Sequence, residues 1–483
     1  MTDAISQRSE VAAVFLIKRK FKMGKIRFFT AMAAAKLAYF GLRLLGRNAT
    51  YLPGEIAVHI CPDFIGYLTK PETVICVTGT NGKTTTSNLL NSVLTACGYD
   101  VLNNSLGSNV HGGIASALLS QSTFSGKPKK KLAVLEVDER SSLLVYKHLT
   151  PDFLIVNNIM RDSVKRNAHT EFISYILNTA VPAETKVILN ADDIICASLV
   201  PQCKNRTYFG VDAEAPATAE LPFVRDIVYC PVCGGGLKYD YVRFNHIGRC
   251  RCEKCGWGSP ERDFTVTAID RENNTFTVRH DGCDTVLRLV NDNIVNVFNC
   301  CGAFALLSRF GLSDETVKNA FEKLEIVKTR LETVKEKDVN ITMLLAKGQN
   351  PVACTRCYAY AASDNAPNKC ILLINDDKED NIHNSENTCW LYDCDFSYFA
   401  DESIAEVIFA GPRCKDTYLR ALIAGVDPAK IKTCLDTRDG AKLVDFDKCK
   451  EIFVFYDNYR VDDAEAVKKT LIQRINGSNG KEK

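Results

Sequence analysis

The stretch from Val74 to Thr86, Val-Ile-Cys-Val-Thr-Gly-Thr-Asn-Gly-Lys-Thr-Thr-Thr, constrains this chain more than any other segment. An apolar strand runs directly into a turn bounded by Gly79 and Gly82, and residues at helical spacing follow. In such a unit the backbone N–H groups of the turn and the positive end of the helix point at phosphate oxygens. The sequence therefore predicts a nucleotide site rather than a plain turn.

The residue types in this loop suit phosphate binding. Lys83 can neutralise phosphate charge, and the Thr84 hydroxyl can bind magnesium. The loop is shorter than the usual G-x-x-x-x-G-K-[ST] pattern, because only two residues separate its glycines. The candidate nucleotide-binding residues are Gly79, Thr80, Asn81, Gly82, Lys83, Thr84 and Thr85.

A second apolar strand begins at Leu132 and carries acidic residues at its end, starting with Glu136. Ligands of open α/β sheets collect at the carboxyl ends of the strands, so Glu136 is a candidate magnesium ligand, directly or through water. A buried or capping carboxylate is the alternative. Strand and helix patterns alternate from residue 73 to 193, which predicts a doubly wound, mostly parallel sheet.

Four cysteines at C-x2-C-x18-C-x2-C spacing interrupt this pattern. Two CxxC turns can present four thiolates to one tetrahedral site, which predicts an inserted structural zinc ribbon at residues 225–262. Two redox or buried pairs are the alternative. Cys250 lies nearby but would leave Cys255 without a partner in its turn, so it is not assigned. The expected zinc ligands are Cys230, Cys233, Cys252 and Cys255.

Three alternating segments after the ribbon, within 264–290, predict a small antiparallel sheet. Residues 325–338 carry eight charges in fourteen positions and are interpreted as a hinge. Strand and helix patterns alternate again beyond it. The expected domains are an N-terminal basic helix region at 1–50, a central ATP-binding domain at 51–328, a C-terminal Rossmann-like α/β domain at 329–476 and a disordered tail at 477–483.

Residues 23–46 repeat apolar residues at three- and four-residue spacing with basic residues between them. This pattern predicts an amphipathic basic helix rather than a membrane span. The helix could lie on an anionic membrane surface or pack on its own domain with a solvated basic face. No secretory signal is expected before it, and translation could begin at Met1 or Met23.

Composition excludes some classes of protein. With 483 residues, 46% hydrophobic and 24% charged, the chain is typical of a globular protein of two or three domains. A net charge of +2 gives no whole-protein field for nucleic acid. The 21 cysteines are odd in number, and several lie in apolar runs, so we expect them to be reduced in a cytoplasmic protein.

These residues resemble the Mur ligase family, whose loop reads Thr-Gly-Thr-Asn-Gly-Lys-Thr-Thr as residues 78–85 do here. Within this family, the ribbon that opens Tyr-Cys-Pro-x-Cys-Gly at Tyr229 is similar to that of the MurT family of lipid II isoglutaminyl synthase subunits. Leu189-Asn-Ala-Asp-Asp and the pair Asn296 and Asn299 also match. Fewer than eighty residues precede the loop, which is too few for the UDP-binding first domain of most Mur ligases. MurT subunits also lack that domain.

The resemblance implies an ATP-dependent amidation in peptidoglycan synthesis. The α-carboxylate of D-glutamate in lipid II would be phosphorylated, and ammonia would displace the phosphate to give D-isoglutamine. It also implies a heterodimer with a GatD-like glutaminase subunit that supplies ammonia, a place at the inner face of the cell membrane, and the cofactors ATP, Mg²⁺ and Zn²⁺. Asn299 matches a family position near the nucleotide, with a helix N-cap as the alternative.

The chain departs from the family at two places. Asn387-Thr-Cys-Trp stands where the family has Asp-Thr-Ser-Trp, whose Asp is implied to complete the glutaminase triad across the subunit interface. An amide cannot stabilise an imidazolium as a carboxylate does, so Glu386 is the candidate replacement. Arg161-Asp162-Ser-Val-Lys-Arg follows the family's Arg-Asp-Gln-x-Asp-Arg only in part, which leaves the substrate contacts open.

Two other functions fit the residues. A Mur-type or folylpolyglutamate-synthase-like ligase, which joins an amino acid to a carboxylate, would share the loop, although the folate enzymes lack the ribbon. A nucleotide-dependent nucleic-acid or scaffold protein would use the basic and aromatic residues of the ribbon, but the near-zero net charge argues against it.

Overall fold

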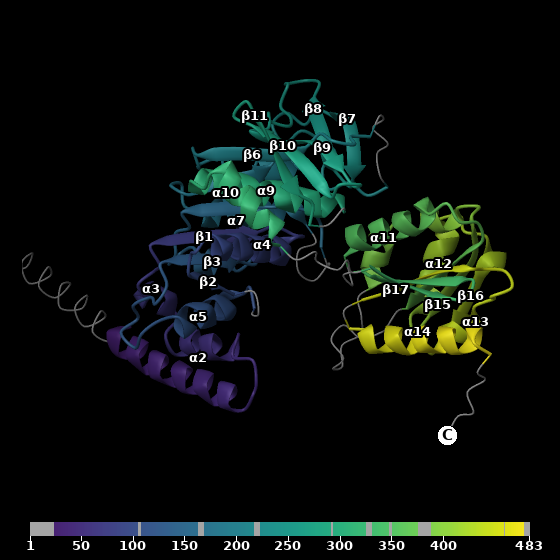
Figure 1. Ribbon diagram of the computed structural model, residues 1–483, viewed down its shortest axis with the longest axis horizontal. Helices are drawn as coiled ribbons and strands as arrows, with labels where there is room; N and C mark the ends of the chain where they lie inside the picture. The colour runs from purple at the N-terminus through teal and green to yellow at the C-terminus, as the bar shows by residue number, and fades with distance from the viewer. Residues whose placement is uncertain are drawn as a thin grey trace, which may run out of the picture.

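The computed structural model places two β-sheets in two lobes that lie beside each other (Figure 1). It describes residues 24–104, 108–162, 169–216, 223–290, 293–324, 331–346, 350–374, 388–457 and 459–477. Among these residues, no helix is both long enough and apolar enough to cross a lipid bilayer.

The first lobe is built on a nine-stranded sheet with the order β11-β10-β9-β6-β5-β4-β1-β3-β2. Its strands are β1 Thr73–Thr78, β2 Val101–Asn103, β3 Leu132–Glu136, β4 Phe153–Val156, β5 Lys186–Asn190, β6 Arg206–Val211, β9 Phe264–Asp270, β10 Thr275–His280 and β11 Cys283–Arg288. Its helices are α2 Leu52–Ile60, α3 Phe64–Tyr67, α4 Lys83–Ala96, α5 His111–Ser120, α6 Ser142–Val145, α7 Thr170–Ala180, α8 Ile194–Ala197, α9 Ile294–Phe310 and α10 Asp314–Glu322.

Helices bury both faces of this sheet. Along β1, Val74 and Cys76 lie in a hydrophobic cluster with residues of α5 and α7, whereas Ile75 and Val77 lie in a second cluster with residues of α4 and α9. Strand β1 pairs in parallel with β3 and β4, and β4 pairs in parallel with β5. The near-continuous apolar strands are explained by burial on both faces, and the predicted doubly wound sheet is confirmed.

The antiparallel pairing expected within 264–290 is confirmed, but the three strands extend the large sheet and do not form a small sheet of their own. Strands β9, β10 and β11 pair antiparallel with one another, but β9 also pairs in parallel with β6, with Phe264 opposite Phe209. Phe264, Val266 and Phe276 are buried in the same cluster as the β6 residues. Joining the large sheet covers these side chains, which a three-stranded sheet on its own would leave partly in water.

The second lobe contains a six-stranded sheet with the order β12-β13-β17-β14-β15-β16. All its pairings are parallel except that between β12 and β13, and helices again lie on both faces. This arrangement confirms a Rossmann-like α/β domain. Its elements are β12 Leu331–Glu336, β13 Val339–Leu345, α11 Pro351–Ser363, β14 Lys369–Ile374, η1 Thr388–Asp393, η2 Phe396–Ala400, β15 Ile404–Ala410, α12 Cys414–Ile423, η3 Pro428–Lys430, β16 Ile431–Cys434, α13 Gly440–Leu443, β17 Glu451–Tyr456 and α14 Val461–Ile475.

The hinge interpretation of residues 325–338 is wrong for its second half. Residues 331–336 form strand β12 at the edge of the second sheet, and Lys337, with φ of 54°, lies in the turn to β13. Charged side chains are common on edge strands, because they prevent pairing with other chains. Residues 325–330 of the expected hinge lie outside the described residues, as do residues 478–483 of the expected tail.

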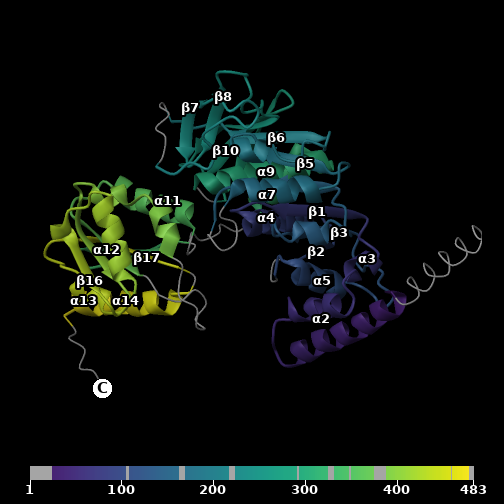
Figure 2. The same ribbon diagram turned by 180° about the vertical axis from the view of Figure 1, so that it is seen from behind.

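The inserted ribbon is a two-stranded hairpin of β7 Leu237–Phe244 and β8 Ile247–Cys252. Seen from both sides, it lies at the end of the first lobe opposite the N-terminal helix (Figures 1 and 2). Tyr239 and Val242 of the hairpin are buried in the core of the first lobe. The ribbon is therefore packed against the lobe rather than held away from it.

The N-terminal helix covers residues 24–44 and packs on its own domain, as one of the two interpretations predicted. Buried Lys36 donates to the carbonyls of Leu119 (3.1 Å) and Ser122 (2.6 Å) and so joins the helix to the end of α5. Burial lowers the pKa of Lys36. The inner-face residues buried in the core are Phe28, Ala31, Met32 and Ala35.

The close packing of α2 on α5 leads to a first prediction. A Cβ atom on Gly54 would lie 1.9 Å from the Gly112 carbonyl oxygen and 2.3 Å from the Ser116 nitrogen, both backbone atoms. We expect Gly54→Ala to destabilise the protein by about 1–3 kcal/mol through overpacking, seen as a lower thermal midpoint.

Gly41→Ala is the matched control, because a Cβ atom there meets nothing within 4 Å. Relief of the glycine cost in a helix should make this variant more stable by about 0.5–1 kcal/mol. A Gly54→Ala protein that melts at or above the wild-type midpoint would contradict the packing of α2 on α5.

Candidate functional site

The glycine loop lies between β1 and α4, where the chain reverses at the carboxyl edge of the sheet. Gly79 and Gly82 have φ of 123° and 81°, in the left-handed region that favours glycine. A Cβ atom on Gly82 would also lie 2.4 Å from Oδ1 of Asn299. Backbone conformation and the approach of Asn299 therefore both require glycine here. Thr84 and Thr85, in the first turn of α4, are exposed and accessible to a ligand.

The segment after β4 fixes the shape of the loop. Asn158 accepts hydrogen bonds from the Asn81 backbone N–H through Oδ1 and from the Thr80 N–H through its carbonyl oxygen, both at 2.9 Å. The Thr80 hydroxyl bonds the backbone of Met160, and Asn157 Nδ2 donates to the Thr86 hydroxyl at 3.0 Å. The loop is thus held by backbone and side-chain groups of the segment that follows the neighbouring strand β4.

Lys83, which is partly exposed, forms an ion pair with Glu139, 2.9 Å from Nζ to Oε1. The Glu139 side chain is fully buried and also accepts the Gly79 N–H at 3.1 Å, while Lys83 donates to the Gly79 carbonyl oxygen at 2.6 Å. Burial alone would lower the pKa of Lys83, but the Glu139 carboxylate outweighs it and raises the pKa. Lys83 is therefore a fixed positive charge at the loop.

Glu136, the expected magnesium ligand, is the last residue of β3 and lies at the same edge of the sheet. It is buried, and its Oε1 accepts a hydrogen bond from Asn109 Nδ2 at 2.8 Å. This contact accounts for one of its lone pairs, and a carboxylate has about four acceptor sites. The oxygen chemistry of Glu136 and the Thr84 hydroxyl is the chemistry that Mg²⁺ prefers.

Asn299 is not a helix N-cap, so that alternative is wrong. Helix α9 begins earlier, at Ile294, and Asn293 is its cap, accepting the Val295 N–H at 3.0 Å. The Asn299 side chain instead faces Gly82, and within the described structure its buried Nδ2 has no hydrogen-bond partner. Buried donors are normally paired, so an open donor beside the loop fits a ligand there.

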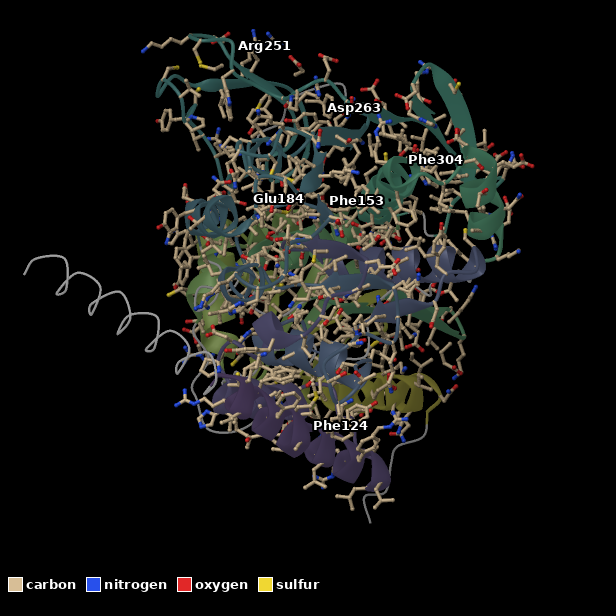
Figure 3. The ribbon with its side chains drawn as sticks, turned by 90° about the vertical axis from the view of Figure 1, so that its left-hand side faces the viewer. Phe124, Phe153, Glu184, Arg251, Asp263 and Phe304 are labelled. Atoms are coloured by element: carbon tan, nitrogen blue, oxygen red, sulfur yellow. The ribbon has the colours of Figure 1, made fainter. Side chains whose placement is uncertain are left out.

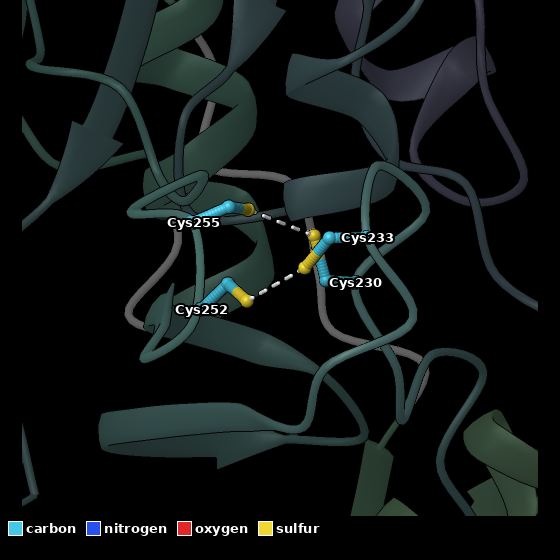
Figure 4. Close-up of side chains that lie close together, drawn as sticks. All are labelled: Cys230, Cys233, Cys252 and Cys255. Atoms are coloured by element: carbon cyan, nitrogen blue, oxygen red, sulfur yellow. Dashed lines mark hydrogen bonds between the residues drawn. The ribbon is translucent and has the colours of Figure 1, made fainter.

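The four ribbon cysteines come together as one cluster (Figure 4). Their Sγ atoms all lie within 4.8 Å of one another, and the close pairs join the two turns, Cys230 to Cys255 at 3.6 Å and Cys233 to Cys252 at 3.5 Å. Four thiolates about one zinc at ~2.3 Å would be about 3.8 Å apart. The cluster therefore fits a single tetrahedral metal better than two redox pairs within the CxxC turns.

The tip of the ribbon hairpin is inserted beside the strand ends. His246 is fully buried, with Nε2 2.9 Å from Asp193 Oδ1 and Nδ1 3.5 Å from Asp226 Oδ2. Burial would lower the pKa of His246, but the two carboxylates outweigh it and raise the pKa to about 10. Asp193 also accepts the Ile159 N–H at 2.6 Å. The ribbon thus contacts, through one charged side chain, the segment that fixes the glycine loop.

Arg161 and Asp162 lie at the junction of the two lobes. Arg161 pairs with Asp226 beside the ribbon at 2.5 Å and with Asp393 of the second lobe at 3.1 Å. Asp162 accepts a hydrogen bond from Asn350, the N-cap of α11, at 3.1 Å. In this structure, the first two residues of the motif contact the ribbon and the second lobe.

Sequence reasoning missed several of these residues. Glu139 lies three residues beyond Glu136 in the same acidic strand end, so the pattern contained it, but nothing in the sequence shows that it pairs with Lys83. Neither His246 nor Asp226 belongs to a sequence motif that would have indicated its role. Glu386 and Asn387, the candidate triad residues, lie outside the described part of the chain.

Comparison with known proteins identifies close relatives. The protein family described as "Mur ligase middle domain" matches residues 77–226. The family described as "MurT ligase C-terminal" matches residues 347–459. The chain is 31% identical over 405 residues to the lipid II isoglutaminyl synthase (glutamine-hydrolyzing) subunit MurT of Staphylococcus aureus strain COL, covering 83% of this chain and 89% of that protein. The subunit of the same name from Streptococcus pneumoniae strain ATCC BAA-255 / R6 is 30% identical over 429 residues, covering 88% and 93%.

Solved structures share the fold. A pseudomurein peptide ligase type C from Methanothermus fervidus has a TM-score of 0.61 at 20% identity, covering 84% of this chain and 80% of that one. A MurF ligase from Thermotoga maritima, solved in complex with ADP, has a TM-score of 0.53 at 13% identity, covering 88% and 84%. At these identities the likeness establishes the fold alone.

The cysteine cluster leads to a second prediction. We expect one zinc per chain in freshly purified protein, with Cys252→Ser losing the metal because its turn can no longer close the tetrahedron. Metal analysis by mass spectrometry measures this directly. Cys250→Ser is the control: Cys250 is buried in the core of the lobe, outside the cluster of four, and this variant should keep its zinc. Full zinc in Cys252→Ser would rule out the assignment.

Proposed function

Because the chain belongs to the MurT family of the Mur ligases, we propose that it amidates lipid II. In this reaction ATP phosphorylates the α-carboxylate of D-glutamate in the stem peptide, and ammonia displaces the phosphate to give D-isoglutamine. The observation that carries the proposal is the loop itself. Lys83, the N-terminal end of α4 and the open Asn299 amide meet at one edge of the sheet, as nucleotide binding requires.

The residues present support distinct roles in this chemistry. Loop amides and Lys83 would hold the phosphates and stabilise the charge that develops on the transferred group. Glu136 and Thr84 would hold Mg²⁺, which supplies further neutralisation of phosphate charge when bound. Asn299 would donate to the nucleotide through its open Nδ2. The remaining loop residues, Gly79, Thr80, Asn81, Gly82 and Thr85, would shape the cradle around it.

The ribbon would have a structural role. A four-thiolate zinc has no open coordination position, so it can hold a fold but not bind a substrate. Its hairpin tip ends at His246, against the strand ends that fix the loop. Zinc would therefore stabilise the hairpin that carries His246 into the core of the first lobe.

The partner and location follow from the same proposal. The Staphylococcus aureus and Streptococcus pneumoniae relatives are named as subunits of a glutamine-hydrolyzing synthase, so this chain would pair with a GatD-like glutaminase that supplies ammonia. Lipid II is a membrane lipid, so the enzyme would work in the cytoplasm at the inner face of the membrane. The proposed domains are those expected above, with boundaries at residues 50, 328 and 476.

The test uses lipid II in detergent micelles with either glutamine and the glutaminase subunit or ammonium as the nitrogen donor. Ammonium should support amidation in the wild type, Glu386→Gln and Asn387→Asp alike. With glutamine, Glu386→Gln should lose most of its activity, since replacing a triad carboxylate by an amide costs on the order of 10⁴ in the serine-protease case. Asn387→Asp should be at least as active as the wild type. Mass spectrometry of the stem peptide gives the readout.

Two results would change the proposal. Glutamine-dependent activity of Glu386→Gln equal to the wild type would remove Glu386 from the triad and leave the lipid II reaction intact. Amidation with neither donor in any variant would replace the lipid II assignment with a Mur-type or folylpolyglutamate-synthase-like amino-acid ligase.

A further inference from the structure

The N-terminal helix has a second apolar face that points away from the protein. At about 100° per residue, six apolar positions form a stripe about 80° wide. The large side chains of the stripe are 53% to 89% exposed, with Leu44 at 89% and Leu37 at 76%. The stripe consists of Ile26, Phe29, Ala33, Leu37, Phe40 and Leu44.

This stripe is separate from the face that holds the helix in place. The inner face, from Phe28 to Ala35, is buried in the core on the opposite side of the helix. A continuous exposed apolar patch of several large side chains is uncommon on soluble proteins unless it contacts a partner or a membrane. The outer face therefore requires an occupant of its own.

Positive charge surrounds the stripe, and acidic residues are absent from it. Residues 24–54 contain five lysines and arginines but no Asp or Glu. Lys25 and Arg43 flank one edge of the stripe, and Arg27 flanks the other, since their helical angles fall on either side of it. All three of these side chains are exposed. An amphipathic helix with this composition is suited to a surface that is apolar beneath and negative at its boundary.

The neighbouring loop at residues 122–131 extends the same surface. It packs on the helix, where Gly126 approaches Phe28, and its Phe124 is 62% exposed, with Lys36 Nζ 5.6 Å from the ring centroid. Figure 3 shows Phe124 beside the N-terminal helix. Lys127 and Lys129 of this loop are exposed as well. The surface thus combines apolar side chains with basic ones on two separate elements.

We propose that this surface, the outer face of helix 24–44 with the loop at 122–131, docks the protein on an anionic phospholipid bilayer. Apolar side chains would enter the boundary between headgroups and acyl chains, and the flanking cations would pair with lipid phosphates. A second copy of the chain is disfavoured, because a symmetric contact would bring like charges together without an acidic partner in the helix. The inference rests on the proposed function in one respect, that the substrate is held in a membrane.

The experiment is co-sedimentation of the full chain with phosphatidylcholine vesicles, with and without phosphatidylglycerol and without lipid II. We expect binding to the anionic vesicles and at least tenfold weaker binding to the neutral ones. Leu37→Glu/Phe40→Glu should weaken anionic binding by more than tenfold. Leu419→Glu/Ile423→Glu makes the same change at exposed positions of α12 in the other lobe and should bind within twofold of the wild type.

A second variant tests the charges without changing the apolar stripe. Arg27→Gln/Arg43→Gln should bind anionic vesicles at least tenfold more weakly, since each cation near such a surface contributes about fivefold. Circular dichroism and the thermal midpoint establish that each variant is folded.

Three results would overturn the proposal: wild-type protein that stays in the supernatant with anionic vesicles, Leu37→Glu/Phe40→Glu that binds them like the wild type, or a wild-type dimer in solution that this variant converts to a monomer. Vesicles without lipid II report docking alone, and the amidation assay in micelles reports the reaction alone. Failure of one is therefore distinguishable from failure of the other.

Discussion

The ion pair between Lys83 and the buried carboxylate of Glu139 is the interaction on which the site depends. A buried charge is tolerated only when it is paired and hydrogen-bonded, and here the Glu139 carboxylate pairs with Lys83 and also accepts the Gly79 N–H, while Lys83 donates to the Gly79 carbonyl. The pair can form because β1 and β3 are parallel neighbours that end at the same edge. Strand order, loop conformation and the position of the charge are therefore consequences of one another.

The sequence predicted the parts of the fold and of the site that depend on residues close together in the chain. The strand, glycine turn and helix around Gly79 and Gly82 formed a recognisable unit, and cysteine spacing anticipated that four thiols would lie together. Contacts between segments far apart in the chain could not be predicted from the sequence. The pairing of β9 with β6 and the unpartnered Asn299 amide depend on how separate segments pack, which hydrophobic periodicity does not specify. Strand β12 was missed because its charges resemble those of a linker.

A chain of charged contacts links the three parts of the molecule. His246 at the ribbon tip lies against Asp226, which pairs with Arg161, and Arg161 reaches Asp393 of the second lobe. The backbone just before Arg161 bonds the Thr80 hydroxyl of the glycine loop. The ribbon, the loop and the second lobe are thus in contact through residues 157–161, which gives the inserted ribbon a physical connection to the site.

Formation of ADP that depends on lipid II and ammonium tests the central claim, that the loop at Lys83 carries the ligase chemistry. The comparison needs Lys83→Ala, Glu139→Gln and the double variant Lys83→Ala/Glu139→Gln. Lys83→Ala alone leaves the Glu139 carboxylate buried without its partner, which costs about 3–5 kcal/mol of stability. The account predicts a loss of at least about 10²-fold in ADP formation for Lys83→Ala and for the double variant. It also predicts that the double variant has a higher thermal midpoint than Lys83→Ala. ADP formation at the wild-type rate in the folded double variant would contradict the account.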